Sequence, residues 1–293
     1  MTQNDQGPPR SIAVAHTIAE ARAALAESVA AGRSIGLVPT MGNLHPGHLT
    51  LVQRALEDCD QVVVSLFVNP TQFGPKEDFA RYPRTLEQDL KHLMDAGAHL
   101  AFVPSVDTMY PLGTANTIRV GTPAAADILC GAARPGHFTG VTTVVTKLFN
   151  IVRPQRAYFG EKDYQQLTIL RLLVQDLHFP VSIIAVPTCR EPDGLAMSSR
   201  NQYLDGEQRR RASEIPRALA TAAEQIGEGA LEHAAIAESG KQALRDAGFD
   251  VDYFEIRRAE DLGVPDANHR NLVVLTAARI GQVRLIDNLR IEV

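Results

Sequence analysis

Short apolar runs alternate with longer segments of helical spacing along the first two thirds of this chain. The apolar runs lie at 35–38, 62–68, 100–103, 157–159 and 181–186. The segments with helical spacing lie at 17–31, 47–57, 86–96, 139–151 and 164–177. Strands that alternate with helices can pair in parallel, and a parallel sheet is covered by helices on both faces. The alternation therefore predicts an α/β fold with a Rossmann-like parallel sheet.

The pattern changes after Arg200. Two charged helices are expected at 206–226 and 231–247, followed by short strands at 251–256, 272–277 and 283–286. The last two strands are expected to pair antiparallel across a tight turn at Gly281. We therefore predict a second, smaller α+β domain, with the boundary near Thr188, so that the domains are 1–188 and 189–293.

Composition limits the classes of partner. The chain has 293 residues, 45% of them hydrophobic, a formal net charge of -5 and a pI near 6.0. Such a charge argues against nucleic acid as the main partner. The first ten residues have no apolar core and are expected to form a disordered leader, and no run reaches the length of a membrane span. We expect a cytoplasmic protein with no membrane partner.

The three cysteines, Cys59, Cys130 and Cys189, are odd in number and lack C-x-x-C spacing. They therefore indicate neither a disulfide framework nor a structural zinc site. We expect the thiols of Cys59 and Cys189 to be buried and inert.

Two histidines three positions apart open a helix directly after the strand predicted at 35–38. The segment reads Met41-Gly42-Asn43-Leu44-His45-Pro46-Gly47-His48. The first turn of a helix has N–H groups without intrahelical partners and carries the positive end of the helix dipole, so it can bind a phosphate. At this spacing His45 and His48 share one helix face, where both imidazoles can reach the same phosphoryl oxygens.

A second polar segment follows the last predicted strand of the first domain. It reads Met197-Ser198-Ser199-Arg200-Asn201 and offers two hydroxyls and a guanidinium. Open α/β sheets bind ligands beyond the carboxyl ends of their strands. A lone H-x-G-H is most often a pair of loop histidines beside a helix cap. Together, however, the H-x-G-H segment and the segment at 197–201 can clamp one triphosphate.

These two segments resemble the signature of the H-x-G-H nucleotidylyltransferase superfamily, which includes class I aminoacyl-tRNA synthetases. More narrowly, the chain resembles the pantothenate synthetase family of pantoate–β-alanine ligases, which form AMP. The resemblance rests on six ordered blocks, at 38–42, 67–73, 82–84, 134–138, 159–166 and 197–201.

The resemblance implies a reaction. It implies ATP-dependent condensation of (R)-pantoate with β-alanine through a pantoyl-adenylate intermediate, with release of AMP and pyrophosphate, in pantothenate and coenzyme A biosynthesis. ATP is then a substrate that arrives with Mg²⁺, the first domain binds ATP and pantoate, and the second acts as a lid domain. A homodimer is also implied.

The resemblance also implies roles for particular residues. His48, His45 and Lys162 are the expected catalytic residues, and Gln72 and Gln166 are the expected anchors for the substrates pantoate and β-alanine. The expected ATP-binding residues are Met41, Gly42, Asn43, Leu44, His45, Pro46, Gly47, His48, Gly160, Glu161, Lys162, Asp163, Cys189, Met197, Ser198, Ser199 and Arg200. Asp163 and Gly160 are placed near the ribose and adenine, and Asp163 also starts a helix as its N-cap.

The pantoate pocket needs apolar walls around a few polar anchors. Met41, Phe67, Val141 and Val144 are candidates, and ordinary core packing explains the four equally well. Asn69, Tyr82 and Arg134 lie in matching blocks and receive no role.

No dense carboxylate cluster is present, so no protein metal site is predicted. Asp89 is the nearest candidate for Mg²⁺, although a solvated helix residue is the expected state. The segment 69–88 contains Pro, Gly and charges with little periodicity, and is expected to be a long loop that acts as a lid.

Two other functions compete. A nucleotidylyltransferase that transfers AMP to a phosphorylated acceptor shares the H-x-G-H loop, but it would lack the glutamine pair and need more cations. A nucleotide-sensing module without turnover would not need His48, Lys162 and Arg200 together.

Overall fold

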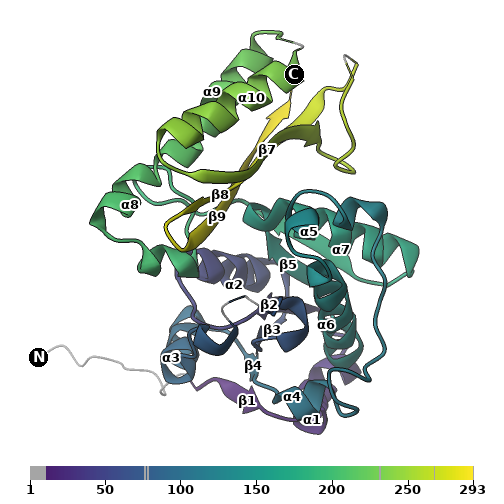
Figure 1. Ribbon diagram of the computed structural model, residues 1–293. Helices are drawn as coiled ribbons and strands as arrows, with labels where there is room; N and C mark the ends of the chain where they lie inside the picture. The colour runs from purple at the N-terminus through teal and green to yellow at the C-terminus, as the bar shows by residue number, and fades with distance from the viewer. Residues whose placement is uncertain (1–10, 76, 78, 231, 267, 293) are drawn as a thin grey trace, which may run out of the picture.

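The computed structural model describes residues 11–75, 77, 79–230, 232–266 and 268–292. The predicted disordered leader, residues 1–10, lies outside the described residues. Figure 1 shows two parts, one built on strands β1–β6 and the other on strands β7–β9.

Six strands form a parallel sheet in the described part of the chain. Its order is β1-β4-β3-β2-β5-β6, and every neighbouring pair is parallel. The strands are β1 (Ala13–Ala15), β2 (Ile35–Thr40), β3 (Gln61–Leu66), β4 (Leu100–Phe102), β5 (Arg156–Gly160) and β6 (Ser182–Val186). The predicted Rossmann-like sheet is confirmed. The edge strand β1 was missed, because only one of its three residues, Ala15, is buried, whereas all three residues of the equally short β4 are buried.

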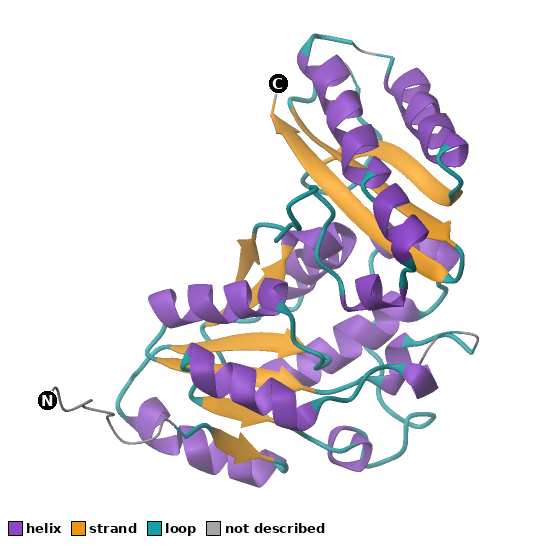
Figure 2. Cartoon of the chain, turned by 90° about the vertical axis from the view of Figure 1, so that its left-hand side faces the viewer, coloured by secondary structure: helices purple, strands orange, loops and turns teal. Residues whose placement is uncertain are grey.

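Helices cover both faces of this sheet (Figure 2). They are α1 (Ile18–Ala30), α2 (Pro46–Asp58), α3 (Leu86–Ala96), α6 (His137–Val152) and α7 (Tyr164–Asp176), with the short α4 (Val106–Met109) and α5 (Cys130–Ala133). Successive strand residues face opposite sides. Leu37 packs in the core with α1 and α6, whereas Val38 packs in the core with α2 and α3.

The strand order places three loops together. From β2 the chain continues to β3 and β4 in one direction, whereas β5 and β6 extend the sheet in the other. The topology therefore reverses between β2 and β5, and such a switch point opens a crevice at the carboxyl ends of the strands. The loops that follow Thr40, Gly160 and Val186 meet at this crevice. They carry the H-x-G-H segment, Lys162 and the serine-arginine segment.

In the described residues of the second part, two helices, α9 (Glu214–Gly227) and α10 (His233–Asp246), pack against a three-stranded antiparallel sheet, and the short helix α8 (Gly206–Arg211) precedes them. The strands are β7 (Asp250–Arg258), β8 (Asn271–Ile280) and β9 (Val283–Glu292). The predicted hairpin is confirmed: β8 and β9 join at Gly281, whose φ of +59° suits glycine. The domain boundary at 188/189 stays a prediction.

The prediction of a single helix at 206–226 is wrong. The structure breaks it between α8 and α9, at Ala212 and Ser213. Pro216 explains the break, because a proline ring clashes with the carbonyl four residues earlier, here that of Ala212.

The segment 69–88 is not one irregular loop. It contains the 3₁₀ helices η1 (Pro70–Gln72) and η2 (Phe79–Arg81) and the first residues of α3. Its role as a lid stays a prediction.

Candidate active site

A cavity of about 250 Å³ lies at the switch point and continues into a wider cleft of about 1410 Å³ between the two parts of the molecule. Most of the predicted site residues line the smaller cavity: Met41, His45, Gly47, His48, Gln72, Gly160, Lys162, Asp163, Gln166, Cys189, Met197, Ser198, Ser199 and Arg200. The other predicted ATP-binding residues, Gly42, Asn43, Leu44, Pro46 and Glu161, do not line it. The structure thus brings together side chains that are more than 150 positions apart in sequence.

The two histidines stand together at the start of α2. His45 is the N-cap, and the ring centroids of His45 and His48 are 4.0 Å apart. The backbone N–H of His45 donates to Nδ1 of His48 at 3.2 Å. Because Nδ1 accepts this bond, the proton of a neutral His48 sits on Nε2. Nε2 is therefore the atom that can donate to a phosphate oxygen.

Both imidazoles are neutral at physiological pH. Burial lowers the pKa of His48 to about 3, and the neighbouring His45 and the charge of Lys162 add to this. Burial and then Lys162 lower the pKa of His45 to about 4. Among the described residues, the buried Nδ1 of His45 has no hydrogen-bond partner. Such an atom is costly in the free protein and indicates a place where a ligand atom binds.

The expectation that Asp89 is a solvated helix residue is wrong. Asp89 is only 2% exposed, and its carboxylate accepts the backbone N–H groups of Asn43 at 2.9 Å and Leu44 at 2.7 Å. It also accepts the hydroxyl of Thr85 at 3.2 Å. The N–H groups of Asn43 and Leu44 are thus occupied by a protein anion. Asp89 holds the backbone of the H-x-G-H loop, in which Gly42 and Asn43 are left-handed, with φ of +76° and +51°.

Lys162 and Asp163 come from the next loop of the crevice. They lie in η4 (Glu161–Asp163), directly after β5. Among the described residues, no carboxylate forms a salt bridge with Lys162. Asp163 is the N-cap of α7 by position, as predicted, but its side chain makes no capping hydrogen bond within the described chain. Lys162 and Asp163 therefore both line the cavity, where their charged groups can interact with a ligand.

The third loop connects to the first. The hydroxyl of Ser199 donates to the carbonyl oxygen of Asn43 at 3.4 Å, and Ser198 caps η5 (Ser199–Tyr203) by accepting the N–H of Arg200 at 3.2 Å. The N–H of Met197 donates to the carbonyl of Cys189 at 2.9 Å. Cys189 is half-exposed on the cavity wall, so its predicted burial is wrong, whereas Cys59 is buried.

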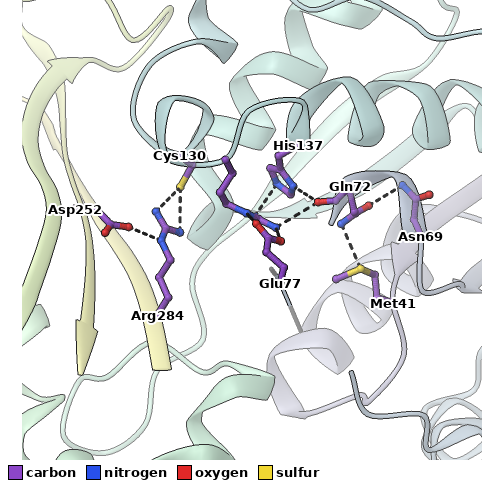
Figure 3. Close-up of polar contacts among 9 residues, drawn as sticks. Met41, Asn69, Gln72, Glu77, Cys130, His137, Asp252 and Arg284 are labelled. Carbon is purple, nitrogen blue, oxygen red and sulfur yellow. Dashed lines mark hydrogen bonds and ion pairs between the residues drawn. The ribbon is translucent and has the colours of Figure 1, made fainter. Parts of the chain in front are cut away.

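Gln72 lines the same cavity and takes part in a set of hydrogen bonds (Figure 3). Its Oε1 accepts from Asn69 at 3.0 Å, and its Nε2 donates to the sulfur of Met41 at 3.3 Å. The carbonyl oxygen of Gln72 accepts from Nδ1 of His137 at 2.8 Å. Since a guanidinium only donates, the 3.0 Å contact between Arg134 and Nε2 of His137 requires that nitrogen to be unprotonated. His137 is therefore neutral, with its proton on Nδ1.

An ion pair supports this arrangement. Arg134 donates to both carboxylate oxygens of Glu77, at 2.7 and 2.6 Å. Burial alone raises the pKa of Glu77, but the hydrogen bonds and charge of Arg134 outweigh it and hold that pKa below its usual range. Burial and then Arg134 lower the pKa of His137 to about 4. Sequence reasoning missed Glu77 and His137, although His137 lies in the quoted block at 134–138.

Four apolar residues line the same cavity, namely Met41, Phe67, Val141 and Val144. Phe67, Val141 and Val144 are also buried core residues, so each of them both packs in the core and lines the cavity. Gln166 lines both the cavity and the wider cleft. Its neighbour Gln165 was missed: it is buried and donates to the carbonyls of Ala125 and Ile128 at 2.8 Å each.

Two other features are absent from the described residues. No group of three His, Cys, Asp or Glu residues there is placed to hold a metal ion. No helix within the described ranges has the length and apolar character needed to cross a membrane.

Comparison with known proteins gives one consistent result. A sequence model of the family described as Pantoate-beta-alanine ligase matches residues 13–290. A pantothenate synthetase of Ectopseudomonas mendocina is 54% identical over 94% of this chain and 97% of its own length. One of Azotobacter vinelandii is 51% identical, with 94% and 98% covered.

Solved structures agree. The crystal structure of a pantothenate synthetase from Thermus thermophilus matches with a TM-score of 0.89 and 48% identity, over 95% of this chain and 99% of that one. A pantoate-β-alanine ligase from Francisella tularensis, described as complexed with β-γ ATP and β-alanine, matches with a TM-score of 0.80 and 35% identity, over 95% and 97%. Family, near-complete coverage and fold all coincide, and this chain belongs to the pantoate-β-alanine ligase family.

Proposed function

We propose that this chain condenses pantoate with β-alanine using ATP, with the triphosphate at the histidine end of the cavity and pantoate at the Gln72 end. One observation carries the proposal. The neutral donors His45 and His48 and the cation Lys162 line the same 250 Å³ cavity as Gln72 and Gln166. A phosphate site and an uncharged amide site within one cavity suit a reaction in which a carboxylate attacks a phosphorus atom.

The first step activates the acid. A pantoate carboxylate oxygen forms a bond to the α-phosphorus of ATP, and the bond from that phosphorus to the bridging oxygen breaks to release pyrophosphate. Negative charge moves onto the phosphoryl and leaving oxygens. Nε2–H of His48 and the ammonium of Lys162 stabilise that charge in a site with little water. Ser198, Ser199 and Arg200 bind the outer phosphates.

The second step forms the amide. The neutral amine of β-alanine attacks the acyl carbon of pantoyl adenylate, the bond from that carbon to the phosphate oxygen breaks, and AMP leaves as the nitrogen passes one proton to water. Gln72 and Gln166 hold the pantoyl group through its hydroxyl and carbonyl oxygens. The apolar walls, including Val141 and Val144, contact its two methyl groups.

Magnesium enters with ATP in this proposal. Asp89 is occupied by Asn43, Leu44 and Thr85, so it does not fit a metal ligand without giving up those bonds. Phosphate oxygens and water are then the ligands of Mg²⁺. We also propose a cytoplasmic homodimer, as in the expectation from the family resemblance.

Exchange of labelled pyrophosphate into ATP tests the function. We expect exchange that depends on pantoate and needs no β-alanine. A nucleotidylyltransferase would instead exchange with a phosphorylated acceptor, and a sensing module would bind ATP without exchange. Either of these results would overturn the proposal.

A further inference from the structure

Asn288, in strand β9 of the C-terminal part, contacts the loop that carries Lys162. Its Nδ2 donates to the carbonyl oxygens of Glu161 and Lys162, at 2.9 Å each. Asn288 is 5% exposed, so water does not compete for these bonds. The amide group of Asn has two N–H donors, and this geometry uses both on one loop. Two consecutive carbonyls of η4 are therefore fixed by a side chain that is 126 positions away in sequence.

The preceding residue fixes Asn288 in turn. Asp287 is buried, and its carboxylate accepts from Arg190 at 2.7 and 3.0 Å. The same carboxylate accepts the backbone N–H of Asn288 at 2.8 Å, and Arg190 donates to the carbonyl of Asn288 at 3.2 Å. Burial raises the pKa of Asp287 more than Arg190 lowers it. Asp287 and Arg190 thus hold the backbone on both sides of the Asn288 side chain.

The loop in question needs such support. η4 is a three-residue turn between β5 and α7, and in the described chain Asp163 does not cap α7 with its side chain. A short 3₁₀ turn has weaker internal hydrogen bonds than an α-helix. Lys162 also has a long flexible side chain, so the direction of its ammonium depends on where its backbone is held.

We propose that Asn288 is a positioning residue for Lys162. It fixes the backbone of η4 so that the ammonium of Lys162 is directed at the phosphates of ATP, and in this way the C-terminal sheet forms part of the nucleotide site. Figure 1 shows the β8–β9 hairpin extending toward the sheet of the first part, and the wide cleft is lined by Lys162, Asp287 and Asn288 together. The inference rests on the proposed role of Lys162.

A double-mutant cycle on ATP affinity tests the proposal. Asn288→Ala removes both donors, and we expect ATP affinity, measured by calorimetry, to fall roughly tenfold, while pantoate affinity changes less than about twofold. In a Lys162→Ala background, Asn288→Ala should weaken ATP binding by no more than about a further twofold. Asn271→Ala, an exposed asparagine on the neighbouring strand β8, is the matched control and should have no effect.

A purely structural role gives a different result. If Asn288→Ala weakens ATP binding by the same factor with and without Lys162, the residue does not act through Lys162 and the proposal is wrong. Asn288→Ser keeps one hydroxyl donor and should give an intermediate loss of ATP affinity. This variant provides a second test if the alanine variant fails to fold. An unchanged affinity in Lys162→Ala alone would instead contradict the proposed function of Lys162.

Discussion

The residues that we propose to bind phosphate and those that we propose to bind pantoate, called the phosphate end and the acid end of the cavity, are held in different ways. At the phosphate end the backbone is held, by Asp89, while the functional groups await a partner: in the described chain Nδ1 of His45 is unpaired and Lys162 forms no salt bridge. At the acid end the functional group is itself held, since both amide atoms of Gln72 are hydrogen-bonded.

The chemistry of the ligands explains this difference. A triphosphate brings enough charge to displace water from unpaired donors, so those donors must be left free for it. Pantoate offers two hydroxyls and a small carboxylate, and its orientation must come from groups that are already aligned. In the proposed assignment Gln72 binds pantoate without losing these partners, because each amide atom has a second hydrogen-bonding position and the contact with the sulfur of Met41 is weak.

The largest effect is expected at the phosphate end. His48→Ala removes the donor that we propose stabilises the transition state, and kcat should fall roughly 10²-fold or more, about 2.7 kcal/mol. The midpoint of thermal unfolding should change little, because the ring accepts one long hydrogen bond from the N–H of His45 and the residue lines the cavity. Steady-state kinetics and a melting curve measure both. A variant that turns over like the wild type, or one that loses stability and activity together, would contradict a free donor at this end.

The next effect is expected at the acid end. Gln72→Ala should raise KM for pantoate by roughly ten- to thirtyfold, because it removes an aligned donor and acceptor and leaves Asn69 without one partner. ATP affinity by calorimetry should stay near that of the wild type. Gln166→Ala is the matched comparison: it should also raise KM for pantoate but cost less stability. Equal losses of ATP and pantoate affinity would show that the two ends are not separate.

The pH dependence of stability also distinguishes the proposed phosphate end from the proposed acid end. The folded pKa values of His45 and His137 are about 4 and that of His48 is about 3, all below the ordinary 6.5, so the unfolded chain binds more protons between these values. Stability should therefore be complete above pH 6.5 and fall as the pH drops toward 4. The slope is at most about 1.4 kcal/mol per pH unit for each histidine, and less where water screens a partly exposed ring.

ATP provides the comparison in urea denaturation at pH 7, 6 and 5. Bound phosphate should raise the pKa of His45 and reduce its part of the slope, while the part from His137, whose partners are Gln72 and Arg134, should remain. His137→Gln should remove that remaining part. An identical slope in wild type and His137→Gln would show that this ring does not stay neutral in the folded protein.

The sequence predicted those features that depend on local patterns. Strand-length apolar runs gave the parallel sheet, and the glycine turn at Gly281 gave the last hairpin. The missed features depend on pairs that are distant in sequence. Nothing near Asn288 indicates that its amide binds the carbonyls of Glu161 and Lys162. In the same way, an acidic residue in the first turn of a helix is usually solvated, and Asp89 differs because the H-x-G-H loop folds over it.

The smallest effect tests that loop anchor. Asp89→Asn keeps the size of the side chain but replaces one acceptor oxygen by an NH₂ group, so one of the N–H groups of Asn43 and Leu44 must face a donor. We expect KM for ATP to rise about three- to tenfold, roughly 1 kcal/mol, with kcat and KM for pantoate within twofold of wild type.

The matched control is Asp95→Asn, in the last turn of the same helix α3, where the side chain is exposed. It makes the same change of charge and should leave KM for ATP unchanged. If Asp89→Asn instead lowers activity through the Mg²⁺ requirement, so that added Mg²⁺ restores KM for ATP, Asp89 acts on the metal. The backbone of the phosphate end would then not depend on this carboxylate, and the contrast between a held backbone and free functional groups would fail at its central residue.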